Sequence, residues 1–216
     1  MKLKSICVAG AVLLSTVGAQ AALTAYAPWD AAYTGNGLNG VQFNVQSAGG
    51  VTVALGAHAY KNGATMPNDG VSTFYGQRGT YAGPPAESDR ANWSFDFAWN
   101  LGTGCSGCSV WLGIDTDPTA GVNLVFGNLT SLGFPGSLPG ESWNMEMAFL
   151  TSGLSYDFDP FGDSSTAFRL EVRDSNGRDV VGSDITVNVP EPGSLALVGL
   201  GLAGLVALRR RPKPAQ

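Results

Sequence analysis

The chain has 216 residues, of which only 13% are charged, and its formal net charge is −5. Half of its twelve basic residues lie in the two terminal segments, so positions 22–189 hold six basic against sixteen acidic residues, a balance of −10. A body this acidic would be repelled by nucleic acid and by anionic lipid headgroups, which argues against both as partners.

The N-terminal segment has the three parts of a secretory signal peptide. Lys2 and Lys4 precede an apolar run at 6–17, and Ala19-Gln20-Ala21 supplies a small-x-small cleavage site. This predicts a signal peptide at 1–21 that engages the Sec machinery and is removed by signal peptidase directly after Ala21 or one residue later. The body between this peptide and the C-terminal segment is long enough for one domain with a core of its own.

The body predicts a series of short strands separated by turns rich in Gly, Asn and Pro. Alternation is clearest at 93–101, where the large apolar residues fall on one face, as in a strand with one buried face. The predicted strands are 41–46, 51–60, a short one at 71–75, 93–101, 110–114, 122–126, 143–150, 167–173 and 179–189. About eight strands and no amphipathic helix predict an all-β single β-sandwich over 22–188, in preference to a closed barrel.

Two of these strands carry predictions that depend on which face is buried. In 143–150, the predicted inner face holds Trp143, Met145, Met147 and Phe149. In 51–60, alternation places His58 on the face opposite the apolar residues. A lone histidine could act as a general base, but no Ser or Cys nucleophile can be paired with it from the sequence. A solvent-exposed strand histidine is therefore the preferred interpretation.

Cys105 and Cys108 lie in a Gly-rich loop between two predicted strands. In an exported protein the two should form a disulfide that acts as a structural clip. The alternatives are a thiol redox site, free thiols or metal binding. A redox site would need a thiolate stabilised at a helix start, which this loop does not predict. Two sulfurs without a nearby histidine cannot complete a tetrahedral zinc site.

Trp111 is out of phase with the apolar alternation of strand 110–114. It could serve as a platform on which a sugar ring stacks. It could also be covered by the second sheet or by a loop, and covering is the favoured interpretation.

Two similar segments, Asp115-Thr116-Asp117-Pro118 and Asp157-Phe158-Asp159-Pro160, follow apolar or aromatic residues, and Asp163 lies just beyond the second. Alternate aspartates at a strand end point to the same side, and calcium binds such clusters of oxygen ligands. The candidate ligands are Asp115, Asp117, Asp157, Asp159 and Asp163. Asp near Pro also forms turns, which is the simpler interpretation. Carboxylate pairs serve glycoside hydrolysis as well, but only at a cleft spacing that a sequence does not reveal.

The C-terminal segment has three parts in a fixed order. Pro190 and Pro192 lack amide donors and keep their neighbours extended, as a protease substrate must be. The uncharged run at 195–208 would span roughly 21 Å as a helix, short of the ~30 Å hydrocarbon core, so it predicts a marginal membrane anchor. The cluster Arg209-Arg210-Arg211 then indicates a cytoplasmic stop, with everything upstream outside the cytoplasm.

In this order, Val189-Pro190-Glu191-Pro192, the apolar run and the Arg cluster closely resemble the PEP-CTERM sorting signal of Gram-negative bacteria, here at 189–216. The resemblance implies that the tail holds the precursor in the inner membrane until a membrane protease, an exosortase, cuts at or near the motif. It implies passage of the body to the cell surface or extracellular matrix. It concerns sorting only, because members of this group resemble one another mainly in the tail.

The group is associated with exopolysaccharide and biofilm, so the resemblance implies a surface or matrix protein, and we expect its ectodomain to be non-catalytic. No cofactor is expected, apart from the calcium considered above. One alternative is a carbohydrate-binding module that recognises the matrix polysaccharide through Trp111 and loop aromatics such as Tyr75 and Tyr81. The other is a polysaccharide-active enzyme, which the lone histidine and missing nucleophile motif disfavour.

Overall fold

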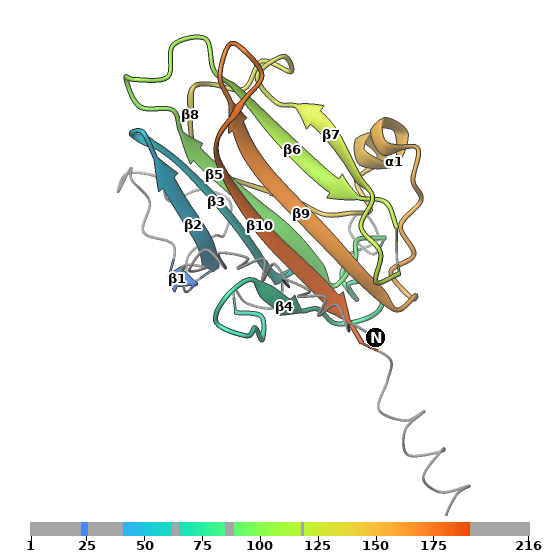
Figure 1. Ribbon diagram of the computed structural model, residues 1–216. Helices are drawn as coiled ribbons and strands as arrows, with labels where there is room; N and C mark the ends of the chain where they lie inside the picture. The colour runs from blue at the N-terminus through green and yellow to red at the C-terminus, as the bar shows by residue number, and fades with distance from the viewer. Residues whose placement is uncertain (1–22, 26–40, 62–64, 85–88, 118, 191–216) are drawn as a thin grey trace, which may run out of the picture.

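The structure is a computed structural model that describes residues 23–25, 41–61, 65–84, 89–117 and 119–190. Their strands form two five-stranded sheets that lie face to face (Figure 1). The first sheet has the order β1-β2-β3-β5-β8, with β1 Thr24–Ala25, β2 Gln42–Ala48, β3 Val51–Ala59, β5 Trp93–Asn100 and β8 Ser137–Trp143. The second has the order β4-β10-β9-β6-β7, with β4 Thr73–Tyr75, β10 Asp179–Val189, β9 Ser164–Arg173, β6 Ser109–Asp115 and β7 Leu124–Asn128. The predicted all-β sandwich is confirmed for these residues.

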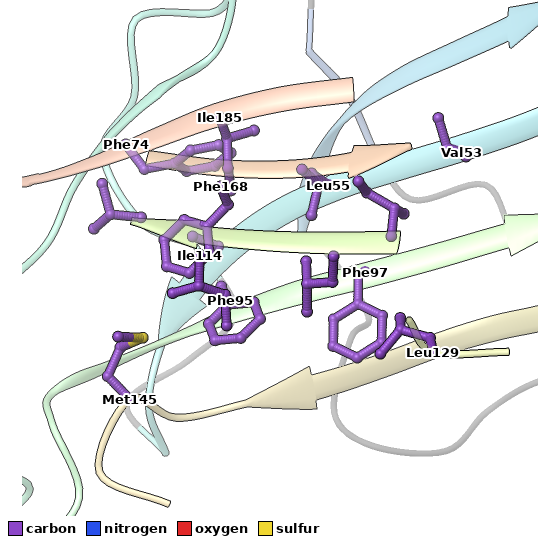
Figure 2. Close-up of a cluster of buried hydrophobic side chains, with 14 of the residues drawn as sticks. Val53, Leu55, Phe74, Phe95, Phe97, Ile114, Leu129, Met145, Phe168 and Ile185 are labelled. Atoms are coloured by element: carbon purple, nitrogen blue, oxygen red, sulfur yellow. The ribbon is translucent and has the colours of Figure 1, made fainter. Parts of the chain in front are cut away.

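The core lies between the two sheets, where the alternating apolar residues of β3 and β5 meet those of β6, β9 and β10 (Figure 2). Phe95 of β5 stacks on Phe168 of β9 with ring centroids 4.4 Å apart, which ties the two layers together. Trp93 and Trp99 are almost fully buried. Burying an aromatic side chain of this size removes roughly 150–250 Å² of surface from water, so these buried aromatic residues are a main source of fold stability.

The two sides of the sandwich are closed differently. On one side the Asn44 side chain of β2 donates to the Asp184 carbonyl of β10 at 2.8 Å, and Ser183 Oγ donates to the Asn44 carbonyl at 2.7 Å. On the other side, where β7 and β8 are the edge strands, the short helix α1 (Ala148–Leu154) covers the opening (Figure 1). An apolar cavity of about 150 Å³ remains beside α1, lined in part by Ile114, Leu150 and Gly153.

The predicted strand at 143–150 is wrong, because β8 ends at Trp143 and α1 begins at Ala148. The cause is Asn144, which is fully buried. Its side-chain amide donates to the carbonyls of Ala91 and Trp93, and its Oδ1 accepts from the Ala91 amide. These bonds end the strand in a turn. Phe149, predicted to point inward, is therefore 52% exposed.

β5 is buried on both faces, not on one. The second face of this strand was expected to be exposed to solvent. Its residues Ser94, Asp96 and Ala98 are at most 1% exposed. β5 lies between β3 and β8, so it is a central strand of its sheet.

The signal peptide at 1–21 and the apolar run at 195–208 lie outside the described residues. Among the helices that are described, none is long and apolar enough to cross a membrane.

Candidate functional site

The last strand of the fold is held on both of its edges up to Asn188, and on one edge up to its final residue, Val189. β10 runs antiparallel to β9, and the final register position pairs Val189 with Ser164. On its other edge β10 runs parallel to β4, and the Gly76 amide donates to the Asn188 carbonyl at 2.8 Å. Val189 is buried at 3% exposure, whereas Pro190, the next residue, is exposed. The backbone therefore leaves the sheet abruptly at Pro190.

This exit lies at the end of the sandwich where β9 begins and β6 ends (Figure 1). The two predicted aspartate segments follow β6 and precede β9, so they lie at the same end. Tyr156 is close to both of them: burial, and then the charges of Asp115, Asp117 and Asp159, raise the pKa of its phenol. The end of the fold from which the C-terminal segment leaves is thus strongly acidic.

The aspartates hold turns instead of gathering into one ligand set. Asp115 is 1% exposed, and its carboxylate accepts from the amides of Asp117, Asn123 and Ala167 at 3.0, 2.7 and 3.4 Å. Asp117 accepts from the Thr119 amide at 2.9 Å, and this bond lowers the pKa of its carboxyl. Within the described part of the chain, no three His, Cys, Asp or Glu side chains come together as a metal site. This geometry gives the calcium prediction no support.

Cys105 and Cys108 form a disulfide in the loop between β5 and β6, as predicted. The Cys108 amide donates to the Cys105 carbonyl at 3.3 Å, so the bridge closes a tight turn. The loop contains no helix whose start could stabilise a thiolate. The arrangement fits a structural clip.

Trp111 is half-buried on the outer face of the second sheet, and its ring is covered by a side chain. The Arg173 guanidinium lies 4.6 Å from the centre of the indole ring, and the indole N–H donates to Ser109 Oγ at 2.9 Å. Arg173 in turn is held by Glu171, which also binds Arg169 and is 2% exposed. A cation over an indole face competes with any sugar ring for that face.

The prediction of a solvent-exposed His58 is wrong. His58 is 8% exposed, and its Nδ1 lies 2.8 Å from Oδ2 of Asp96, which is fully buried on the neighbouring strand β5. Burial favours the neutral imidazole, but contact with the Asp96 carboxylate at this distance prevails and raises the pKa of His58. The sequence signal for this pair was an aspartate in the middle of a strongly apolar strand.

β10 ends at Val189, directly before Pro190, as expected for a folded body whose last strand leads directly into a processing signal. Comparison with known families agrees, because the model of the PEP-CTERM protein-sorting motif matches residues 188–211. The chain thus carries a sorting motif that marks it as an exported protein processed by an exosortase. The match starts two residues before Pro190, inside β10. No curated protein and no solved structure matches the chain.

Of the residues predicted for sorting, the structure describes Val189 and Pro190. The other predicted positions lie outside the described residues, and these are Ala21, Glu191, Pro192, Arg209, Arg210 and Arg211.

Proposed function

We propose that this chain is the precursor of a non-catalytic surface or matrix protein. It crosses the inner membrane through the Sec machinery, loses its signal peptide near Ala21, and stays anchored through 195–208 with Arg209, Arg210 and Arg211 on the cytoplasmic side. Exosortase then cuts at or near Pro190-Glu191-Pro192. The released sandwich joins the cell surface or extracellular matrix, in association with exopolysaccharide.

The observation that carries this proposal is the junction between β10 and the motif. Val189 is buried and paired, and the matched motif already includes it and Asn188. The fold therefore places Pro190 immediately outside the sheet and exposed. Prolines favour the extended conformation that a protease substrate needs.

The proposal of a non-catalytic body is supported by the state of its only histidine. His58 is buried against Asp96, and the Ser142 hydroxyl is hydrogen-bonded to the Asp96 carboxylate. A serine nucleophile would have to be hydrogen-bonded to the imidazole. The carbohydrate-binding alternative through Trp111 is less well supported, because Arg173 lies over its ring.

The test is to express the chain in a host with an exosortase and in the same host with that gene deleted. We expect a mature form outside the inner membrane in the first host, and an uncut membrane form in the second. The C-terminus of the mature form should map near Pro190 by mass spectrometry. Sedimentation of this form with extracellular matrix, compared between strains with and without polysaccharide synthesis, tests the second half of the proposal. Equal processing in both hosts would contradict it.

A further inference from the structure

A small pocket with an acidic wall opens at the end of the sandwich, next to the start of β9. It has a volume of about 200 Å³ and is lined by Tyr156, Asp157, Phe158, Asp159, Gly162, Asp163 and Ser164. A cavity of about 150 Å³ with apolar walls is known to hold a benzene ring, so this pocket has room for one six-membered ring with substituents. It is far larger than a bare metal ion needs.

One wall of the pocket carries a buried hydroxyl without a partner. Ser164 is 9% exposed, and its Oγ finds no hydrogen-bond partner among the described residues. A buried hydroxyl left unpaired costs about 1–3 kcal/mol unless a water or a ligand satisfies it. Because Ser164 lines the pocket, a group bound there could satisfy this hydroxyl.

The carboxylates of the pocket are only partly used by the protein. Asp163 faces Arg78 at 3.4 Å, and Asp159 accepts from the Phe161 amide through Oδ1 at 2.8 Å. Asp157 is exposed at the pocket wall. Acceptor capacity and negative charge therefore remain at Asp157 and at Oδ2 of Asp159. Arg78 offsets only part of this charge.

The negative field extends beyond the pocket wall. Burial, and then the charges of Asp157 and Asp89, raise the pKa of Glu146, and its Oε1 is also buried without a partner. A neutral ligand would leave this repulsion in place, whereas a cation would relieve it. The aromatic ring of Tyr156 adds a wall suited to the carbon face of a ring.

We infer that this pocket binds a sugar unit that carries a protonated primary amine. The ammonium group lies between Asp157 and Asp159, a sugar hydroxyl pairs with Ser164 Oγ, and the ring rests against Tyr156. The inference deepens the proposed association with a polysaccharide, and it rests on that proposal only for the natural source of the sugar. The pocket itself can be tested with monosaccharides.

The experiment is calorimetric titration of the purified full-length chain, kept in a detergent without a sugar headgroup. Glucosamine is the probe, and glucose, N-acetylglucosamine and calcium chloride are the comparisons. We expect saturable binding of glucosamine, with affinities for glucose and N-acetylglucosamine lower by about tenfold, since they lack the charge. Affinity should also fall with added salt and above the pKa of the amine.

Three pocket variants and one matched control locate the site. Asp157→Asn and Asp159→Asn should each weaken glucosamine binding by about five- to tenfold. Ser164→Ala should weaken binding without lowering the melting temperature of the free protein, because its hydroxyl has no partner to lose. Asp179→Asn removes the same charge from an exposed site outside the pocket and should bind normally.

Several results would overturn the inference. They are the absence of saturable glucosamine binding, equal binding of glucose, tighter binding of calcium through the same aspartates, or equal weakening in Asp179→Asn. Failure of sorting in the exosortase experiment would leave these titrations unaffected, so the two proposals can fail separately.

Discussion

Val189 pairs with Ser164 at the last position of the β9–β10 ladder, so the final residue of the fold and a wall residue of the acidic pocket share one register position. The processing signal therefore leaves the sheet beside the pocket. Cutting just beyond Pro190 would leave the sandwich intact, because every backbone pairing of β10 lies upstream of that residue.

Replacing Pro190, Glu191 and Pro192 by alanines should block processing and leave the full-length form in the membrane. Alanines restore the amide donors and allow a helix to extend through the cleavage site. Immunoblots of membrane and medium fractions, with intact masses, measure this outcome. Gln77→Ala with Thr103→Ala, at exposed loop positions, serves as the control. Release of the alanine variant with a normal C-terminus would contradict the sorting interpretation.

The exported protein should contain no free thiol, because Cys105 and Cys108 are joined. Thiol labelling of the native, unreduced protein measures this. The double variant Cys105→Ser/Cys108→Ser should lose only roughly 2 kcal/mol of unfolding free energy, since entropic stabilisation is small for so short a loop. Ser106→Ala, which keeps the bridge, is the control. Stoichiometric labelling of both cysteines would refute the prediction.

How far the sequence predicts this fold depends on whether a feature is local. Alternation of large apolar residues located β3, β5, β9 and β10, because the two-residue period of a strand is visible in consecutive residues of the sequence. β8 was missed because Pro139 and Gly140 are typical of loops, and an edge strand tolerates both. The turn after β8 depends on Asn144 reaching back to residues about fifty positions upstream, which no local pattern shows.

The candidate site divides in the same way. The sorting motif is a contiguous sequence signal, and its predicted start at Val189 lies one residue after the start of the family match, which covers 188–211. The aspartates were identified, but their roles depend on distant partners, since Asp115 is held in part by Ala167 on another strand. The pair of His58 and Asp96 arises from the β3–β5 register, in which His58 lies opposite Ser94. Alternation alone gives a face, not a register.

Stability should depend on pH through His58. Asp96 raises the folded-state pKa of His58 above the ordinary value of about 6.5. The pair therefore stabilises fully just below pH ~6.5, and this contribution is lost as the pH rises through the folded-state pKa of His58. Burial raises the pKa of Asp96 as well, so the contribution is also lost at lower pH, where Asp96 takes up a proton. Asp96→Asn should lower the unfolding free energy by about 1–3 kcal/mol near pH 6 and flatten its pH dependence above that point.

Denaturant unfolding of the full-length chain between pH 6 and 9 measures this difference. Asp89→Asn, at an exposed carboxylate, is the matched control. If wild-type stability relative to Asp96→Asn increased with pH in this window, the assigned direction of the His58 pKa would be incorrect.

Gly153→Ala should stabilise the fold. Gly153 lies in α1 and lines the apolar cavity, and an added Cβ would meet no atom within 4 Å. Replacing a helical glycine by alanine is worth about 0.5–1 kcal/mol. Gly102→Ala should do the opposite, because its φ is +60° and the new Cβ would lie 2.5 Å from the Gly50 carbonyl oxygen. Melting temperatures of the two variants decide this, and a lower value for Gly153→Ala would show that α1 is packed more tightly than described.

Asp115→Ala should be the most costly of the aspartate substitutions, because its carboxylate is 1% exposed and accepts from three backbone amides. Losing these three hydrogen bonds to a charged acceptor should lower the unfolding free energy by about 2–4 kcal/mol. Asp159→Ala removes one bond to an exposed turn and should cost less than about 1 kcal/mol. Chelator should leave the melting temperature of the unmutated chain unchanged, because these carboxylates are engaged with backbone amides. A large drop with chelator, or equal losses for the two variants, would instead indicate that the aspartates act together as ligands of a cation.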